Sequence, residues 1–259
     1  MIVDSHCHLD HFQGQEQDDV VARAKAAGVA TMVTIGTRLG EQAATVRAIA
    51  DRHDGVFATV GIHPHNAGER EAPTVAEILR EADHPKVIGI GESGLDYFYD
   101  KAPRPMQAES FRAHIAAARV SGLPLVIHSR DADDDMAAIL EDEAGQGAFP
   151  FLLHCFSSGA DLARLAVRLG GYVSFSGMLT FPKSEAIRAI AAETPADRLL
   201  VETDSPYLAP VPFRGKRCEP GYVVHTAAKL AEVRGLGIAA LAELTTGNFH
   251  RLFTRARAG

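Results

Sequence analysis

Two histidines one residue apart, His6 and His8, lie near the amino terminus behind a short apolar run. The residues at 1–3 predict a buried strand that leads directly into them. Because residues i and i+2 of a strand point to the same face, both imidazoles would aim at one point. Two converging neutral imidazoles can hold a metal ion, although this pair alone would also fit a polar strand end that faces solvent.

Further metal-binding side chains stand where four later apolar runs end. The runs lie at 86–90, 125–127, 151–153 and 199–201, and the residues are Glu92, His128, His154 and Asp204. With the first pair they make four imidazoles and two carboxylates, a donor set that suits zinc, manganese or, less ideally, magnesium. Six ligands exceed what one tetrahedral ion needs, so we predict two divalent metal ions bridged by Glu92, which sits midway in the strand order. Two-metal sites hydrolyse phosphodiesters, esters or amides.

The elements that must position these residues alternate regularly along the chain. Expected strands lie at 1–3, 31–35, 56–62, 86–90, 125–127, 151–153, 172–175 and 199–201, with helices between them and two helices after the last. Strict alternation implies right-handed crossovers and a parallel sheet, and eight repeats in this length match a TIM (β/α)8 barrel. A doubly wound open sheet is the alternative, but it would spread the metal-binding residues along a line, whereas a barrel gathers them at one mouth.

Length and composition bound the remaining possibilities. The 259 residues fit one α/β domain, 1–259, and a hydrophobic fraction of 46% indicates a sizeable core. No apolar run is long enough to span a bilayer and no signal peptide is evident, so we expect a cytoplasmic protein. The net charge of −7 gives no broad attraction for nucleic acid, but bound divalent cations would bring their own positive charge. Nothing indicates a membrane contact or an obligatory protein partner.

Several other residues are expected near the mouth as substrate contacts. His63 follows the strand at 56–62 and would touch substrate or support a metal ligand, unless it only ties its loop. Arg130 closely follows His128. Arg214 and Lys216 lie in a basic loop beyond the last strand, where they would either clamp a phosphate or form a solvated surface. Glu202 shares a face with Asp204 one layer deeper and would orient a metal ligand.

Five motifs together closely resemble the TatD family of metal-dependent deoxyribonucleases, within the amidohydrolase-like barrels. They are SHCHLD at 5–10, GESGLD at 91–96, HSRD at 128–131, HCF at 154–156 and ETDSPYL at 202–208. The resemblance runs from residue 3 to about residue 248. Two departures concern substrate contacts: an extra serine in the FSSG segment at 156–159, and Cys218 where the family pattern has asparagine.

The resemblance implies how the metal ligands divide and what they do. One ion would be held by His6, His8, Glu92 and Asp204, and another by Glu92, His128 and His154. Asp204 would also accept a proton from the attacking water. The implied activity is hydrolysis of DNA, and of RNA as a further substrate, typically as a 3′-to-5′ exonuclease.

Two other functions remain open from the sequence. A small-molecule amidohydrolase or lactonase can be built on the same barrel, but many of these bridge their metals with a carboxylated lysine where this chain has Glu92. A non-catalytic metal or nucleic-acid binding module is the third reading, and it has no need of a carboxylate placed to activate water.

Overall fold

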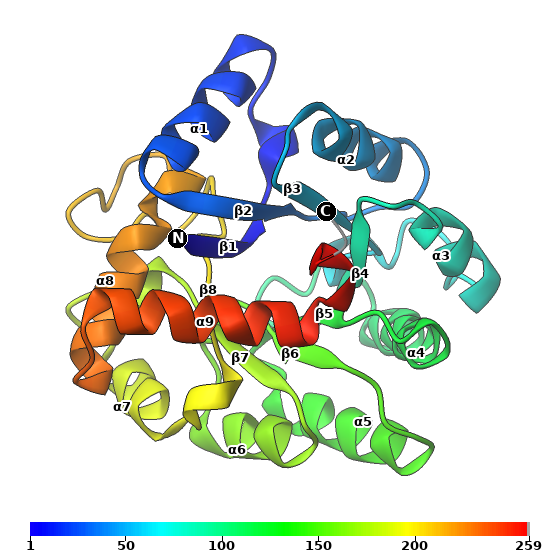
Figure 1. The fold of residues 1–259 in the computed structure, drawn as a ribbon. Coiled ribbons are helices and arrows are strands. Elements are labelled where there is room, and N and C mark those ends of the chain that lie inside the picture. Colours follow the sequence, from blue (N-terminus) through cyan, green and yellow to red (C-terminus); the bar gives the residue numbers. More distant parts are fainter. Residues whose placement is uncertain (258–259) are drawn as a thin grey trace.

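Eight parallel strands follow one another in chain order around a barrel in the computed structural model, which describes residues 1–257 (Figure 1). Their bounds are β1 (Ile2–Cys7), β2 (Val29–Thr34), β3 (Val56–Val60), β4 (Val87–Asp96), β5 (Leu125–Arg130), β6 (Phe151–Leu153), β7 (Tyr172–Phe175) and β8 (Leu199–Val201). Every hydrogen-bonded pair of strands is consecutive in sequence. The predicted (β/α)8 architecture is therefore confirmed.

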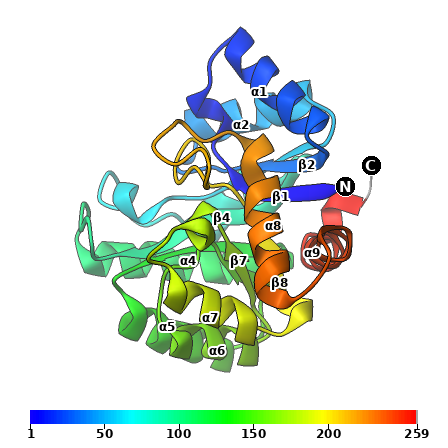
Figure 2. The same ribbon diagram turned by 90° about the vertical axis from the view of Figure 1, so that its left-hand side faces the viewer.

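Helices cover the outside of the barrel and one of its ends. They are α1 (Gln15–Ala26), α2 (Glu41–Arg52), α3 (Val75–Ala82), α4 (Arg104–Ser121), α5 (Asp133–Gly145), α6 (Ala160–Arg168), α7 (Glu185–Glu193), α8 (Val223–Arg234) and α9 (Ile238–Leu252). Figure 2 shows α9 and both termini at one end of the barrel, while the loops after β3 and β8 extend at the other. Within residues 1–257, no helix combines the length and the apolar character that crossing a bilayer requires.

The barrel closes where its first and last strands meet. Cys7 and Ser205 form a parallel bridge just beyond β8. On either side of it, the His8 amide donates to the Ser205 carbonyl (2.7 Å) and the Asp204 amide donates to the His6 carbonyl (2.9 Å). The backbone bonds that close the barrel thus bring together three predicted metal ligands from opposite ends of the chain.

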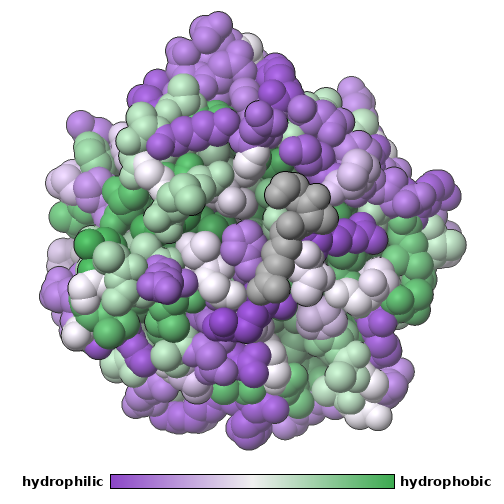
Figure 3. Space-filling view, viewed as in Figure 1, coloured by the Kyte–Doolittle hydropathy of each residue, from purple (hydrophilic) through white to green (hydrophobic). Residues whose placement is uncertain are grey.

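The two ends of the barrel differ in chemistry. At the end that α9 covers, Val3, Ile88 and Leu200 from three strands form one buried apolar cluster with Phe249 and Phe253. Figure 3 views this end and shows hydrophilic residues scattered among hydrophobic ones. Because α9 fills this end with apolar side chains, the polar residues of the strands are left to face the opposite mouth.

Strands β4 and β5 run further than the apolar runs at 86–90 and 125–127 predict. Beyond an irregularity in the ladder, Gly94 pairs with His128. Gly91 and Gly94 have φ angles of +111° and +149°, and a Cβ atom at Gly94 would lie 2.0 Å from the His128 carbonyl oxygen. Only glycine permits so close an approach in this backbone conformation. Glu92 and His128 consequently stand within paired strands instead of in the loops that follow them.

Candidate metal centre

The first group of candidate ligands comes from the seam between β1 and β8. The His6 Nε2 atom lies 3.3 Å from His8 Nε2, 3.5 Å from Glu92 Oε2 and 3.6 Å from Asp204 Oδ1. His8 Nε2 lies 3.4 Å from Asp204 Oδ1 and 4.0 Å from Glu92 Oε2. Ligands about 2.1 Å from a tetrahedral ion are separated from one another by roughly 3.4 Å. The four side chains therefore fit around one cation.

The second group uses the other oxygen of the same glutamate. Glu92 Oε1 lies 2.8 Å from His154 Nε2 and 3.0 Å from His128 Nδ1, and these two nitrogens are 3.3 Å apart. The Glu92 side chain is only 2% exposed, so both of its oxygens are committed to this cluster. The two groups thus meet at Glu92, the residue predicted to bridge them.

His63 also reaches Glu92, but the tautomer it adopts disfavours a ligand role. Its Nε2 atom lies 3.4 Å from Glu92 Oε1, while its Nδ1 atom accepts a hydrogen bond from the His65 amide. Burial lowers the pKa of His63 to about 4, so its ring is neutral near pH 7. A neutral ring whose Nδ1 accepts carries its proton on Nε2. His63 is therefore oriented to donate to Glu92 or to a substrate oxygen.

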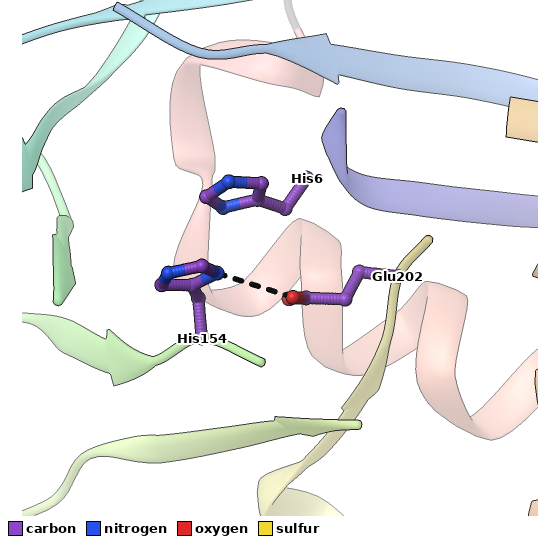
Figure 4. A group of neighbouring side chains, drawn as sticks. All are labelled: His6, His154 and Glu202. Atoms are coloured by element: carbon purple, nitrogen blue, oxygen red, sulfur yellow. Dashed lines mark hydrogen bonds and ion pairs between the residues drawn. The ribbon is translucent and has the colours of Figure 1, made fainter. Parts of the chain in front are cut away.

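The Glu202 carboxylate points toward the ring of His154, as Figure 4 shows. Its Oε1 atom is 3.2 Å from His154 Nδ1 and also accepts from the Cys155 amide at 2.8 Å. The ring of His6 stacks on that of His154, with centroids 3.9 Å apart. By accepting from Nδ1, Glu202 leaves Nε2 of His154 free for a cation, which is the orienting contact expected for it.

Asp96 plays the corresponding part for His128, a role that no local sequence pattern predicts. Its Oδ2 atom lies 3.0 Å from His128 Nε2 and 2.8 Å from His65 Nε2, and the carboxylate is 1% exposed. The His128 proton consequently sits on Nε2, and Nδ1 faces Glu92. Asp96 ends the GESGLD motif, where an aspartate looks like an ordinary turn residue. Its role becomes visible only when the fold brings in the histidines of two other segments.

The electrostatics of this cluster favour bound cations. Burial alone would raise the pKa of Glu92, but the surrounding His154, His63 and His128 outweigh it and hold the pKa well below its usual range. Burial also raises the pKa of Asp204, but His8 and His6 lower it by a larger amount, so the net pKa lies below the usual value. Conversely, Glu92 and Glu202 overcome the burial of His154 and raise its pKa well above the ordinary value. A site that stabilises a proton on an imidazole by nearby carboxylates attracts metal cations for the same reason.

A pocket of about 620 Å³ opens above the cluster at the carboxyl ends of the strands. Among the predicted substrate contacts, His63 and Arg130 line it. Arg214 and Lys216 do not: their cationic groups lie over the rings of Phe181 (4.4 Å) and Phe213 (5.8 Å). The phosphate contacts predicted for this loop stay a prediction.

Cys7 and Cys218 are buried, whereas Cys155 is only partly buried. β6 ends at Leu153, so the strand alternation that would turn Cys155 away from His154 no longer applies. The residue has a φ of +43° and lines the pocket. Burial raises the pKa of its thiol well above the usual value, and its sulfur lies 3.3 Å from the Ser176 hydroxyl.

A family model described as TatD related DNase matches residues 3–254. The chain belongs to the TatD family. Its relatives include the Bacillus subtilis protein YabD, named an uncharacterized metal-dependent hydrolase, which is 40% identical over 98% of this chain and 99% of its own. A 3′-5′ ssDNA/RNA exonuclease TatD from Enterobacter lignolyticus is 36% identical over 92% and 93% of the two chains. The crystal structure of YJJV, a TatD homologue from Escherichia coli, superposes with a TM-score of 0.88 at 28% identity and covers 98% of each chain.

Membership of the TatD family places this chain among the metal-dependent hydrolases. The side chains fit that description: carboxylate oxygens and imidazole nitrogens converge at ligand-to-ligand distances, and carboxylates orient the rings of His128 and His154. The family assignment made from five short motifs is therefore confirmed.

Proposed function

We propose that this TatD-family hydrolase uses two divalent metal ions to cleave nucleic-acid phosphodiester bonds, removing nucleotides from the 3′ end of single strands. The proposal rests on the two carboxylate oxygens of Glu92, each of which faces a different group of candidate ligands. Its Oε2 atom faces the His6, His8 and Asp204 group, and its Oε1 atom faces His128 and His154. One buried carboxylate between two ligand groups is the arrangement that a bridged pair of ions requires.

Divalent ions in such a centre supply Lewis-acid polarisation of a phosphoryl oxygen and lower the pKa of water. The chain's own residues supply the rest. Asp204 is ionised, and its side chain is 14% exposed toward the pocket, so it can take a proton from an attacking water. His63, with its proton on Nε2, can donate to a substrate oxygen. Four imidazoles among six ligands favour zinc or manganese over magnesium.

The choice of nucleic acid as substrate rests on two supports. A relative at 36% identity carries the name of a 3′-5′ ssDNA/RNA exonuclease. In this chain, Arg130 lines the pocket that holds the ligand groups, where its guanidinium can contact a phosphate next to the scissile one. With a net charge of −7, the attraction for a polyanion must come from such local cations and from the metal ions.

The test is cleavage of an end-labelled single-stranded oligonucleotide by purified protein. Activity should vanish with a chelator and return with Mn²⁺, Zn²⁺ or Mg²⁺, and shortening should proceed from the 3′ end. Glu92→Gln should abolish turnover, because it removes the anionic bridge. Asp100→Asn, at an exposed carboxylate that pairs with Arg104, is the matched control and should leave turnover unchanged. A Glu92→Gln protein that keeps more than about a tenth of wild-type activity, a loss of only ~1.4 kcal/mol, would contradict the two-metal reading.

A further inference from the structure

Exposed aromatic side chains gather at the mouth of the barrel. Tyr99 is 62% exposed and Phe98 is 55% exposed in the loop after β4, and Tyr207 is 50% exposed in the loop after β8. Both tyrosines line the pocket above the metal-binding residues. Large aromatic rings that remain exposed lose the stabilisation that burial would provide. Such exposed rings beside a pocket are typical of surfaces that bind a ligand.

The two tyrosines stand on opposite sides of the candidate metal centre. The ring of Tyr99 packs edge-on against His65, with centroids 5.3 Å apart, and the Tyr99 amide donates to Asp96. It therefore belongs to the His128 side of the centre. The ring of Tyr207 packs edge-on near His8, at 6.1 Å, on the seam between β1 and β8. In an eight-stranded barrel, β4 lies across the mouth from β8, so the metal-binding atoms lie between the two rings.

Cations accompany only one of these rings inside the pocket. The Lys101 ammonium lies 5.7 Å from the centroid of Tyr99, and the Arg130 guanidinium lies 4.9 Å from that of Phe98. Both cations line the pocket. On the other side, Arg217 is engaged with the Glu16 carboxylate and the His11 carbonyl oxygen and does not line the pocket. Lys101 and Arg130, the lysine and the arginine that line the pocket, thus both lie on the Tyr99 side.

We propose that Tyr99 and Tyr207 each stack on one nucleobase of a single strand whose scissile phosphate lies at the metal centre. Tyr207 holds the base of the 3′-terminal nucleotide that leaves, and Tyr99 holds the base of the nucleotide before it. The charge distribution sets this direction. The retained strand brings one further phosphate with each nucleotide and needs Lys101 and Arg130, whereas the leaving nucleotide brings none beyond the scissile one.

This inference rests on the proposed nuclease function and makes it more specific. Stacking on an aromatic ring accepts every base, because each base has a flat π face. It also requires the base to be free of its own neighbours, so a duplex end would have to fray before it could enter. The exposed rings therefore account for selection of single strands without any reading of sequence.

The experiment is a double-mutant cycle between tyrosines and bases. The full-length protein with Mn²⁺ binds a labelled octanucleotide whose terminal linkage is a non-hydrolysable methylene phosphonate, and affinity is measured by fluorescence anisotropy. Strands carry all bases, an abasic 3′-terminal nucleotide or an abasic penultimate nucleotide. Tyr207→Leu should weaken binding of the complete strand about tenfold and have no effect on the strand without the terminal base. Tyr99→Leu should show the same pattern with the penultimate base.

Two controls complete the design. Tyr99→Phe and Tyr207→Phe keep the ring and should bind like the wild type. Tyr222→Leu removes a ring that stacks on Phe213 outside the pocket and should change nothing. Equal losses on intact and abasic strands would overturn the stacking proposal, and exchanged patterns would overturn its direction. Cleavage of an ordinary strand by the wild-type protein is measured separately. If the tyrosine–base couplings are found but the protein does not cleave, only the proposed nuclease function is overturned.

Discussion

Asparagine in place of Asp96 should weaken one metal site and spare the other. The carboxylate is buried and holds the proton on Nε2 of His128, so that Nδ1 faces the metal-binding side of Glu92. Asparagine has nearly the same shape but no charge. Oδ2 of Asp96 contacts both His128 and His65, while Oδ1 accepts from the Tyr99 amide. The asparagine NH2 group must replace one of these oxygens, so it either faces the Tyr99 amide or leaves both imidazoles without their acceptor. Loss of such a supporting contact lowers metal affinity by a factor of 10–100, about 1.4–2.7 kcal/mol.

The site formed by His6, His8 and Asp204 makes no contact with Asp96 and should keep its ion. Elemental analysis after dialysis should therefore find two ions per chain in the wild type and about one in Asp96→Asn, and titration calorimetry should show that only one of the two binding steps has weakened. Asp100→Asn, four residues further along and exposed, serves as the control. If both steps weaken equally, or if neither moves, Asp96 does not act through His128.

Other consequences of the structure can be measured alongside. Glu202→Gln should lower metal affinity through His154, again by a factor of about 10–100, with little change in the fold by circular dichroism. Burial raises the pKa of Asp4 from 3.8 to about 8, so between these pH values the folded protein binds one proton more than the unfolded chain. The free energy of unfolding should therefore fall as the pH rises from about 4 to about 8. Asp4→Asn should reduce this fall, as measured by urea titrations at several pH values. In binding titrations of catalytically inactive protein against salt, Arg130→Ala and Arg214→Ala should each reduce the slope by about 0.7, and an unchanged slope for Arg214→Ala would make its loop a solvated surface.

The sequence predicted the fold, and it brought the candidate ligands together, because both inferences depend on local patterns. Strand–helix alternation identifies a barrel, and in a barrel the residues that end each strand must share one mouth. His6 and His154 could therefore be grouped although 148 positions of chain separate them in the printed sequence. Their relative geometry needed only the strand period and the closure of the sheet.

What the sequence did not reveal depends on neighbours that are distant in the chain. In the sequence, Asp96 resembles a turn residue; only the folded structure places it against His65 and His128, which belong to other segments. Likewise, the apolar pattern that located β4 stops at residue 90, because the strand continues through glycines whose role is to let the backbone approach β5. The position of Tyr207 across the mouth from Tyr99 is a property of strand order in space, and no local pattern encodes it.

The concentration of buried carboxylates at one end of the barrel links the metal site to the fold itself. Glu92, Asp96 and Glu202 are each at most 2% exposed, and burial of unpaired charge is strongly unfavourable. Hydrogen bonds offset part of this cost; Glu202, for example, accepts from the Cys155 amide. The part of this free-energy cost that is not offset favours the binding of any cation that can enter between the ligands. A mouth built in this way attracts divalent cations, because the fold is otherwise left with negative charge that it cannot solvate. Under the proposed nuclease function, the same negative charge means that a polyanionic substrate needs the cations of the Tyr99 side to approach.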